Sequence, residues 1–523
     1  MSFMFSSLMH NVLPMQPIRS IAARLLPALL IFSALSLAHA GEPHRYSVKI
    51  NERMTVMSVE AHFGSPVDTV SAASNNAGQF LLEARHCGDG YRDSTIRLRN
   101  QRMMLPVGGI RCMNYTVDLA SAAESVRHNR SLAPENIVVS PALWLWRPRL
   151  SDRSRIHLRF DVPSSMQVAV PWLPDGDAPQ AFRLGNSPES AEAPAVFGTF
   201  AYREVEIPGA TLRVSMLQGD GRTQNAMDDD SILEWLRATA SDVSLAYGRF
   251  PNPSPQIVVI PVGDGRQGRS ASAVPFGRVI RDGGEAIELL VDRSQTMEAF
   301  LGDWTATHEF SHLMLPYVER QHRWVSEGFA QYYQNVLLAR SGTYDPLTAW
   351  QKLYEGLERG RQSRPELSPN EATARGLHSA RMKIYWSGAA VALMADVALR
   401  ERSGGTATLD EVMGRLQACC LPSARTWSAP ELFATLDALA GHEVFMPLYR
   451  RYADTAGFPD TRPLFDRLGL TIADRKVRVR RGAELQHIRS AITEWDSRVL
   501  ARREQLAALE FASHRTAGTA GSR

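Results

Sequence analysis

Two short segments, His308-Glu-Phe-Ser-His and Trp324-Val-Ser-Glu-Gly-Phe-Ala, constrain the fold of this chain more than any other feature. In a helix, residues i and i+4 share one face, so a helix through the first segment brings two imidazoles together. Glu309 lies one step round the same helix. Two imidazoles beside a carboxylate are typical of a zinc site. We therefore predict one Zn²⁺ ion bound by His308 and His312, with Glu309 as the general base.

The third zinc ligand is predicted to be Glu327, which follows far enough downstream for one helix to end and a second to begin. Pro316 limits the length of the first helix. The run that starts at Glu327 has helical spacing and closes at Ser341-Gly, a helix stop signal. Glu319 and His322 are the alternative ligands, but they lie in a polar connection where charged residues are usually only solvated.

These ligands predict a definite chemistry. Zinc with three protein ligands keeps a fourth position for water and lowers the pKa of that water from about 15.7 to about 7. Glu309 then needs only to accept a proton. The downstream Glu-Gly-Phe-Ala argues against a chance His-Glu-x-x-His, so the sequence predicts a metallopeptidase site.

Both segments resemble the gluzincin metallopeptidases, the group that contains thermolysin and the relatives of aminopeptidase N. A second block, Tyr385-Trp-Ser-Gly-Ala-Ala-Val-Ala-Leu-Met-Ala-Asp, followed by Thr408-Leu-Asp-Glu-Val-Met, is similar to the glycyl aminopeptidase family, here without its usual PDZ domain. The resemblance implies that Tyr385 donates a hydrogen bond to the oxyanion. The alternative for Tyr385 is a packed helix aromatic, the role expected for Tyr332 and Tyr333.

The chain departs from the family pattern near the substrate. Ser387 stands where the family often has Lys, and no segment resembles the Gly-x-Met-Glu-Asn by which aminopeptidase N relatives bind a free amino terminus. Aminopeptidase and endopeptidase activity therefore both remain open. The segment 270–280, followed by 286–291, is the candidate edge for pairing with an extended peptide by strand addition. Glu285 and Glu288 are either ligands for an amine or exposed carboxylates on a strand.

The amino-terminal residues indicate export. Arg19 and Arg24 precede an apolar run that begins at Leu25, and Ala38-His-Ala fits a small-x-small cleavage site. We predict a signal peptide and, because Arg greatly outnumbers Lys, a bacterial periplasmic location. No later segment offers the roughly 18 uninterrupted apolar residues that a membrane helix needs, so no stable span is expected after signal removal.

Composition excludes some partners and leaves others open. The chain is 44% hydrophobic and 22% charged with a net charge of +3, which is typical of globular proteins and gives no basic field for nucleic acid. The expected partner is a peptide or protein substrate, and the oligomeric state is not specified. Cys87 and Cys112 lie in one β-rich region and are predicted to form a disulfide. The adjacent Cys419 and Cys420 can pair only with strain and are not expected to do so.

The expected fold class is α+β and multidomain. Alternation such as Tyr46-Ser-Val-Lys-Ile predicts half-buried antiparallel strands in an N-terminal, β-sandwich-like domain. Asp228 begins a helix with acidic residues at its positive end, and Ile257-Val-Val-Ile reads as a buried strand of a thermolysin-like α/β lobe. The predicted divisions are a signal peptide at 1–40, the β domain at 41–205, the zinc-binding α/β lobe at 206–343, a helical lobe at 344–474, and a basic helical tail with a disordered end at 475–523.

The leading hypothesis is an exported zinc-dependent peptidase that hydrolyses peptide bonds with metal-activated water. A noncatalytic or latent module of the same fold that binds envelope proteins or peptides is the alternative. A third hypothesis keeps zinc hydrolysis but directs it at another kind of bond.

Overall fold

The computed structural model describes residues 42–494 except 88–95, 100–101, 127–128, 130–131, 151–154, 177, 179, 186–192, 220–226, 263–271, 282 and 377. The predicted signal peptide and the predicted disordered end lie outside the described residues. These two predictions therefore remain untested.

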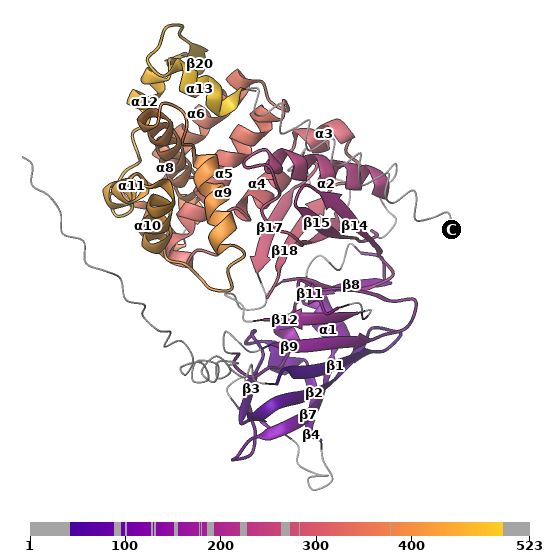
Figure 1. Ribbon diagram of the computed structural model, residues 1–523. Helices are drawn as coiled ribbons and strands as arrows, with labels where there is room; N and C mark the ends of the chain where they lie inside the picture. Colours follow the sequence, from indigo (N-terminus) through magenta and orange to yellow (C-terminus); the bar gives the residue numbers. More distant parts are fainter. Residues whose placement is uncertain are drawn as a thin grey trace, which may run out of the picture. The chain divides into compact units, whose positions relative to one another are not determined.

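The first part of the chain forms a large sheet with the strand order β11-β12-β9-β1-β2-β7-β4 (Figure 1). In β1, Tyr46, Val48 and Ile50 are buried and alternate with exposed residues, as the sequence pattern predicted. Its neighbours β2 and β9 pair with it in opposite senses, β2 antiparallel and β9 parallel. The strands are β1 (His44–Ile50), β2 (Val56–Val67), β4 (Leu81–His86), β7 (Ile110–Asp118), β9 (Ile156–Asp161), β11 (Leu173–Pro174) and β12 (Ala181–Leu184).

Two three-stranded sheets accompany the large sheet, in the orders β10-β13-β8 and β3-β6-β5. Residues of all three sheets share one hydrophobic core, in which the indole of Trp144 packs edge-on against Phe160, Trp172 and Phe197. One hydrophobic core thus joins the three sheets. The additional elements are β3 (Thr69–Ser71), β5 (Leu98–Arg99), β6 (Arg102–Met104), β8 (Asn136–Val139), β10 (Gln167–Ala169), β13 (Ala195–Gly198), α1 (Leu119–Glu124) and the short helices η1 (Ala77–Gln79) and η3 (Pro141–Leu143).

A second, mixed sheet has the order β14-β15-β16-β18-β17. Its strand β16 is buried along its whole length because β15 and β18 flank it in parallel. Asp228 caps α2 by accepting a hydrogen bond from the Ser231 amide, as its position predicted. The bounds are β14 (Ala201–Ile207), β15 (Ala210–Met216), α2 (Asp229–Ser244), β16 (Gln256–Pro261), β17 (Phe276–Arg281) and β18 (Glu285–Val291). The domain boundary predicted at 205/206 falls inside β14, and the division into domains stays a prediction.

A buried arginine of this second sheet contacts the chain that precedes it. Arg213 of β15 is 4% exposed and donates hydrogen bonds to the carbonyl oxygens of Val170, Pro171 and Trp172, at 3.0–3.2 Å. A fourth bond reaches the carbonyl of Ser254. Backbone carbonyl groups thus accept hydrogen bonds from both terminal nitrogens of this buried guanidinium, while its Nε atom has no hydrogen-bond partner among the described residues.

The remainder of the described chain is mainly helical, and the predicted α+β multidomain class is confirmed. Figure 1 shows these helices beside the mixed sheet. They are α3 (Met297–Gly302), α4 (Thr305–His312), η4 (Arg320–His322), α5 (Arg323–Arg340), α6 (Pro346–Gln362), α7 (Pro369–Arg375), η5 (His378–Ala380), α8 (Arg381–Arg402), α9 (Leu409–Cys420), α10 (Ala429–Ala440), α11 (Phe445–Tyr452), α12 (Arg462–Arg467) and α13 (Gln486–Thr493), with a hairpin of β19 (Leu470–Ala473) and β20 (Lys476–Val479).

Helices α5 and α8 cross at two glycines. A Cβ atom at Gly328 would lie 2.1 Å from the Cα of Gly388, and a Cβ at Gly388 would lie 2.1 Å from the carbonyl oxygen of Trp324. No real side chain fits at either distance, so the backbones touch only because both residues lack one. This contact fixes the spacing between two helices that also carry Glu327 and Tyr385.

One described helical stretch, His378–Arg402, is long and apolar enough to cross a membrane by length and composition, and 72% of its apolar window is buried within the protein. Its helix α8 packs against α5 and α6 as part of the core. The apolar character of this helix is therefore explained by packing.

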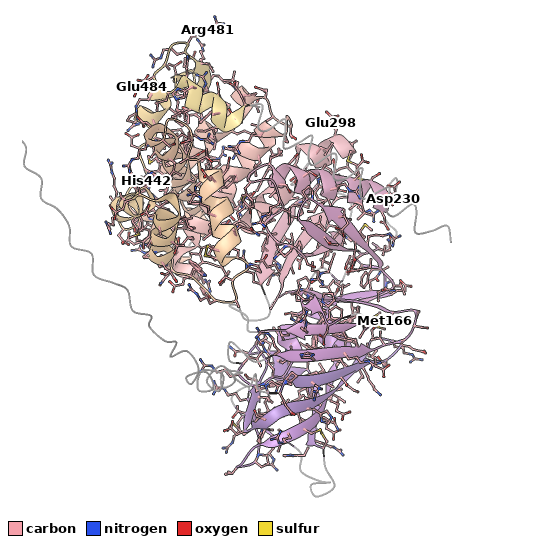
Figure 2. The ribbon with its side chains drawn as sticks, in the orientation of Figure 1. Met166, Asp230, Glu298, His442, Arg481 and Glu484 are labelled. Carbon is pink, nitrogen blue, oxygen red and sulfur yellow. A yellow bond between two sulfur atoms is a disulfide. The ribbon has the colours of Figure 1, made fainter. Side chains whose placement is uncertain are left out.

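The cysteines and the basic run near the end of the chain differ in part from expectation. Cys87 and Cys112 form the predicted disulfide, whereas Cys419 and Cys420, not expected to pair, are also joined at the end of α9. The basic run after 475 begins as strand β20 paired with β19, not as a helix, because a partner strand was close in sequence. Figure 2 labels Arg481 and Glu484, which follow β20.

Candidate metal centre and cleft

Helix α4 places the two predicted histidine ligands one turn apart. The Thr305 hydroxyl donates to the carbonyl of Val274, and the Thr305 amide donates to the carboxylate of Asp303, which ties the first turn to neighbouring chain. His308 and His312 then lie on one face, with ring centroids 4.8 Å apart. The helix ends at His312, before Pro316, as the sequence predicted.

Three donor atoms converge at this point. The Oε2 atom of Glu327 lies 3.4 Å from Nε2 of His308 and 3.5 Å from Nε2 of His312. All three ligand atoms lie within 4.8 Å of one another. Glu327 is on the first turns of α5, as expected. The structure therefore brings together the three residues predicted to hold the metal.

The second ring nitrogens of both histidines contact neighbouring polar side chains. Such contacts orient the imidazoles, as a metal site requires. Nδ1 of His308 lies 3.1 Å from Oε1 of Gln334, and Nδ1 of His312 lies 3.0 Å from the Ser326 hydroxyl. An amide oxygen only accepts, so His308 donates a hydrogen bond through Nδ1, and its Nε2 atom faces the Glu327 carboxylate. Two imidazoles and one carboxylate, each oriented by a second residue, fit Zn²⁺.

Electrostatics keeps the third ligand ionised. Burial raises the pKa of Glu327, but hydrogen bonds from His308 and His312 and the charge of Arg323 outweigh it and hold the pKa well below its usual range. Nε of Arg323 lies 2.6 Å from Oε1 of Glu327. Arg323 thus occupies one carboxylate oxygen and leaves Oε2 facing the histidines.

Glu309, the predicted general base, faces a cleft next to the ligands. Its side chain is 9% exposed and lines a cavity of about 590 Å³ together with His308. Burial raises its pKa, while the two histidines act in the opposite direction. The Cγ atom of Glu309 lies close to Gly277 of edge strand β17. A Cβ atom at Gly277 would be only 2.6 Å from that Cγ. A glycine at this position lets the carboxylate approach the strand.

Tyr385 reaches the same cleft from α8. Its ring stacks on the imidazole of His308 with centroids 5.8 Å apart and an interplanar angle of 16°. Burial and the nearby Glu327 raise the pKa of the phenol, so it carries its proton at neutral pH and can donate a hydrogen bond. The packed-aromatic alternative fits Tyr332 and Tyr333, which are both 1% exposed.

The cleft has an apolar rim and a basic wall. Phe276 and Trp304 line it with 45% and 44% of their surface exposed. On α6 and α8 the lining includes Lys352, Arg359 and Arg381. Apart from Glu309, the described lining residues contribute one further carboxylate, that of Glu355 on α6. The wall therefore carries a net positive charge.

The alternative ligands are occupied elsewhere. Nδ1 of His322 lies 3.1 Å from Oε2 of Glu319, and its Nε2 lies 3.4 Å from the Tyr449 hydroxyl. Neither residue joins the cluster formed by His308 and His312. His322 thus contacts Glu319 and Tyr449 and does not contact the candidate metal ligands.

The structure contradicts the interpretation of Glu285 and Glu288 as exposed carboxylates on a strand. Glu288 is 2% exposed and pairs with Arg278 at 3.1 Å, and Glu285 pairs with Arg281 at 2.8 Å. Antiparallel pairing of β17 with β18 places Arg278 opposite Glu288 and Arg281 opposite Glu285. Arginine neutralises both acids, which leaves neither poised for a substrate amine.

Sequence reasoning missed the residues that orient the ligands. Arg323 and Gln334 lie four residues before and seven residues after Glu327 on α5, so all three share a helix face. Once Glu327 is taken as a ligand, this spacing predicts that Arg323 and Gln334 lie near the metal centre. Ser326 offers no comparable signal, because its contact with His312 depends on how α4 and α5 pack.

Two histidines lie on one helix, a glutamate lies on the next helix, and both helices accompany a mixed sheet. This is the arrangement of the gluzincin class. Residues 305–391 match the sequence profile of a family described as M61 glycyl aminopeptidase. The match runs from α4 into α8 and includes Glu327 and Tyr385, so the resemblance inferred from the sequence is confirmed over this stretch. No curated protein matches the chain.

One solved structure has a similar fold over most of the chain, and two others match it with lower scores. An aminopeptidase N family protein from Idiomarina loihiensis has a TM-score of 0.61 at 14% identity, covering 82% of this chain and 79% of that chain. An M1 zinc metallopeptidase from Deinococcus radiodurans has a TM-score of 0.47 at 14% identity, covering 80% and 94%. A mutant M1 zinc metallopeptidase from the same organism, bound to a Tyr-Ser-Ala substrate, has a TM-score of 0.48 at 14% identity, covering 80% and 95%. Identities this low speak for the fold alone.

Proposed function

We propose that this protein is a zinc-dependent peptidase whose single Zn²⁺ is held by His308, His312 and Glu327. The observation that carries the proposal is the convergence of two imidazole nitrogens and one carboxylate oxygen within 4.8 Å, on a chain that matches a peptidase family over the same residues. When bound, zinc lowers the pKa of a water molecule and so supplies a nucleophile at neutral pH.

The side chains around this position have three roles: proton transfer, stabilisation of the oxyanion and orientation of the imidazoles. Glu309 accepts the proton of the attacking water and can return it to the leaving amine, since its carboxylate opens into the cleft. The Tyr385 phenol, which stacks on His308, donates a hydrogen bond to the developing oxyanion. Gln334 and Ser326 hold the imidazoles in one orientation throughout.

The substrate backbone is expected to extend along β17. This strand is at the edge of its sheet and pairs only with β18 among the described strands. An added peptide strand would use its unpaired backbone groups and would pass Gly277, which lies against Glu309. This arrangement delivers a peptide bond next to the general base.

Charge favours acidic groups on the substrate. The side chains of Lys352 and Arg359 lie over the rings of Tyr344 and Trp386, at 4.7 and 5.6 Å from the ring centroids, and face the cleft with Arg381. An aminopeptidase needs carboxylates for the substrate amine, and the described lining offers only Glu355 beyond Glu309. We therefore propose that a substrate carboxylate, from an acidic side chain or a free carboxyl terminus, binds the basic wall.

Zinc content and hydrolysis of a peptide library test the proposal. Glu309→Gln should keep about one zinc ion and lose cleavage by roughly 10²–10⁴-fold, because only the proton acceptor is removed. Glu298→Gln, an exposed acid on α3 away from the cleft, is the matched control and should behave like the wild type. The cleaved peptides should be enriched in acidic residues, and their ends distinguish exopeptidase from endopeptidase activity.

Two results would overturn the proposal. A wild-type protein without zinc would remove the ligand assignment. Zinc without cleavage of any peptide would favour the noncatalytic module or hydrolysis of another bond. Export to the bacterial periplasm is part of the proposal and rests on the amino-terminal sequence, so sequencing the amino terminus of the exported protein should find Gly41 first.

A further inference from the structure

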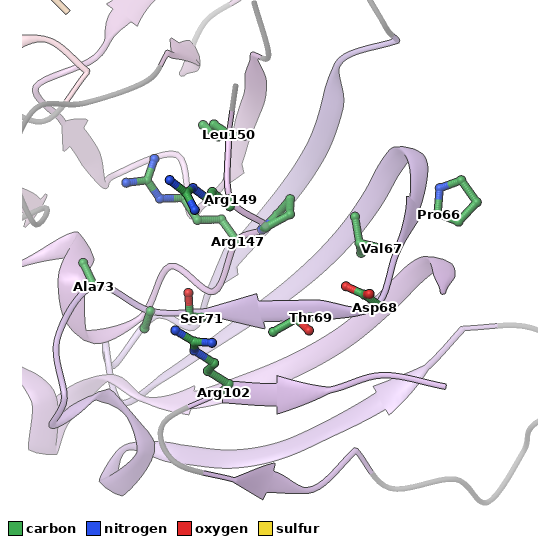
Figure 3. A pocket seen from close by; sticks show the side chains of 12 residues that line it. Pro66, Val67, Asp68, Thr69, Ser71, Ala73, Arg102, Arg147, Arg149 and Leu150 are labelled. Carbon is green, nitrogen blue, oxygen red and sulfur yellow. The ribbon is translucent and has the colours of Figure 1, made fainter. Parts of the chain in front are cut away.

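A cavity of about 1060 Å³ lies in the amino-terminal β domain, apart from the residues of the metal centre (Figure 3). Its wall comes from β3, from the start of β6 and from the segment 147–150. Arg102, Arg147 and Arg149 line it, and Asp68 is the one acidic residue among the lining residues. The cavity is thus strongly basic in a protein whose net charge is only +3.

Backbone pairing sets two of these arginines in a row. Ser71 exchanges both backbone hydrogen bonds with Arg147, each 3.0 Å long, and pairs antiparallel with Arg102 on its other side. Residues directly opposite each other in antiparallel strands point to the same face. Arg102, Ser71 and Arg147 are therefore successive neighbours across one surface, with the two arginine backbones about 10 Å apart.

The same surface is polar along the strand. In β3, Val70 is 1% exposed and belongs to the core, while Thr69 and Ser71 on either side are partly exposed and line the cavity. Thr69 and Ser71 therefore lie on the same face of β3 as the paired Arg102 and Arg147. Figure 3 shows the Arg102 side chain next to Ser71, and Arg147 and Arg149 on the far side of β3.

No ion pair neutralises these arginines within the part of the chain that the structure describes, and Asp68 forms none with them. Like charges held close together repel one another, and an anion bound between them relieves that repulsion. Guanidinium groups are planar donors that bind carboxylate or phosphate with two parallel hydrogen bonds, and three of them line this cavity. A cavity of this volume accommodates an organic molecule.

From this geometry we propose that the cavity is a second binding site, specific for a small organic anion with two carboxylate or phosphate groups. One anionic group lies over Ser71 between Arg102 and Arg147, and Arg149 contacts the second. The site is independent of the peptidase proposal because it shares no residue with the metal centre.

Calorimetric titration of the purified protein at low salt tests this site, with succinate as the carboxylate probe and fructose 1,6-bisphosphate as the phosphate probe. At least one probe should bind the wild type, and added salt should weaken that binding. Arg102→Gln and Arg147→Gln should each weaken it at least about tenfold. Arg147→Lys should give an intermediate loss, since it keeps the charge but not the planar donors.

The matched control is Arg45→Gln, an exposed arginine of β1 that does not line the cavity. It should bind the probe as the wild type does, and all variants should keep the wild-type thermal midpoint without probe. Binding of one probe alone identifies the anionic group that the site prefers. Binding of neither probe, or equal binding by Arg102→Gln, Arg147→Gln and the wild type, would overturn the proposal.

Discussion

Substitution of Gly328 by Ala should damage stability and catalysis together. The new Cβ would lie 2.1 Å from Cα of Gly388, 2.3 Å from its carbonyl carbon and 2.5 Å from the amide nitrogen of Ala389. Ordinary contacts of a Cβ atom begin at 3.4 Å. Each of these neighbours is backbone, so no side chain can rotate away and α5 and α8 must separate by more than an ångström.

The expected cost follows from two opposing effects. Overpacking in a core costs about 1–3 kcal/mol, and a backbone clash belongs near the upper value. Alanine stabilises a helix by about 1 kcal/mol relative to glycine, which leaves a net loss of about 2 kcal/mol. Glu327 precedes Gly328 directly and Tyr385 lies on the opposing helix. A displacement of about 1 Å between them should lower kcat by about 10²-fold.

Urea unfolding followed by tryptophan fluorescence, together with kcat on a cleaved peptide, measures both effects. Gly302→Ala is the matched control, because Gly302 ends α3 and a Cβ there meets nothing within 4 Å. It should unfold at the wild-type urea concentration or slightly above it. Wild-type stability and kcat in Gly328→Ala would refute the argument that the two glycines set the spacing of the helices.

Three further predictions concern individual groups. Tyr385→Phe should lower kcat by about 10²–10³-fold with zinc content unchanged, and an unchanged kcat would make this residue a packing aromatic. Arg323→Gln should weaken zinc binding by about 10–100-fold in a competition with a chelator, because Glu327 loses the partner of its second oxygen; wild-type affinity would exclude that role. Burial raises the pKa of Asp396, but Arg400, the Leu409 amide and the Tyr332 hydroxyl outweigh it and lower the pKa overall. Its stabilisation should therefore be complete above about pH 4, the ordinary range for Asp, and should fade below it. The stability difference between wild type and Asp396→Asn should shrink as the pH falls, and a constant difference would contradict this assignment.

Sequence periodicity was sufficient to predict which three side chains converge at the candidate metal centre. His308 and His312 lie on one helix face because of their spacing, and Glu327 followed from a second helical run. Such local patterns survive folding because a helix determines its own geometry. The capped helix at Asp228 was predictable for the same reason.

Features that depend on packing between distant segments could not be predicted. The alternation in β1 shows which side chains are buried, but it does not reveal that β9, more than a hundred residues later, pairs with it in parallel. The interpretation of Glu288 as an exposed carboxylate was wrong. Its partner Arg278 lies opposite it only once β17 and β18 have paired, which the sequence does not reveal. The Gly328–Gly388 contact likewise exists only in the packed structure.

Arg213 makes the mixed sheet, and with it the metal centre, chemically dependent on the chain that precedes it. Three of its four hydrogen bonds end on carbonyls at 170–172. A fragment that began after these residues would leave Arg213 with one of its four acceptors, the carbonyl of Ser254, and should therefore be less stable than the full chain. Expression of the mixed sheet without residues 170–172 is therefore expected to lower its stability.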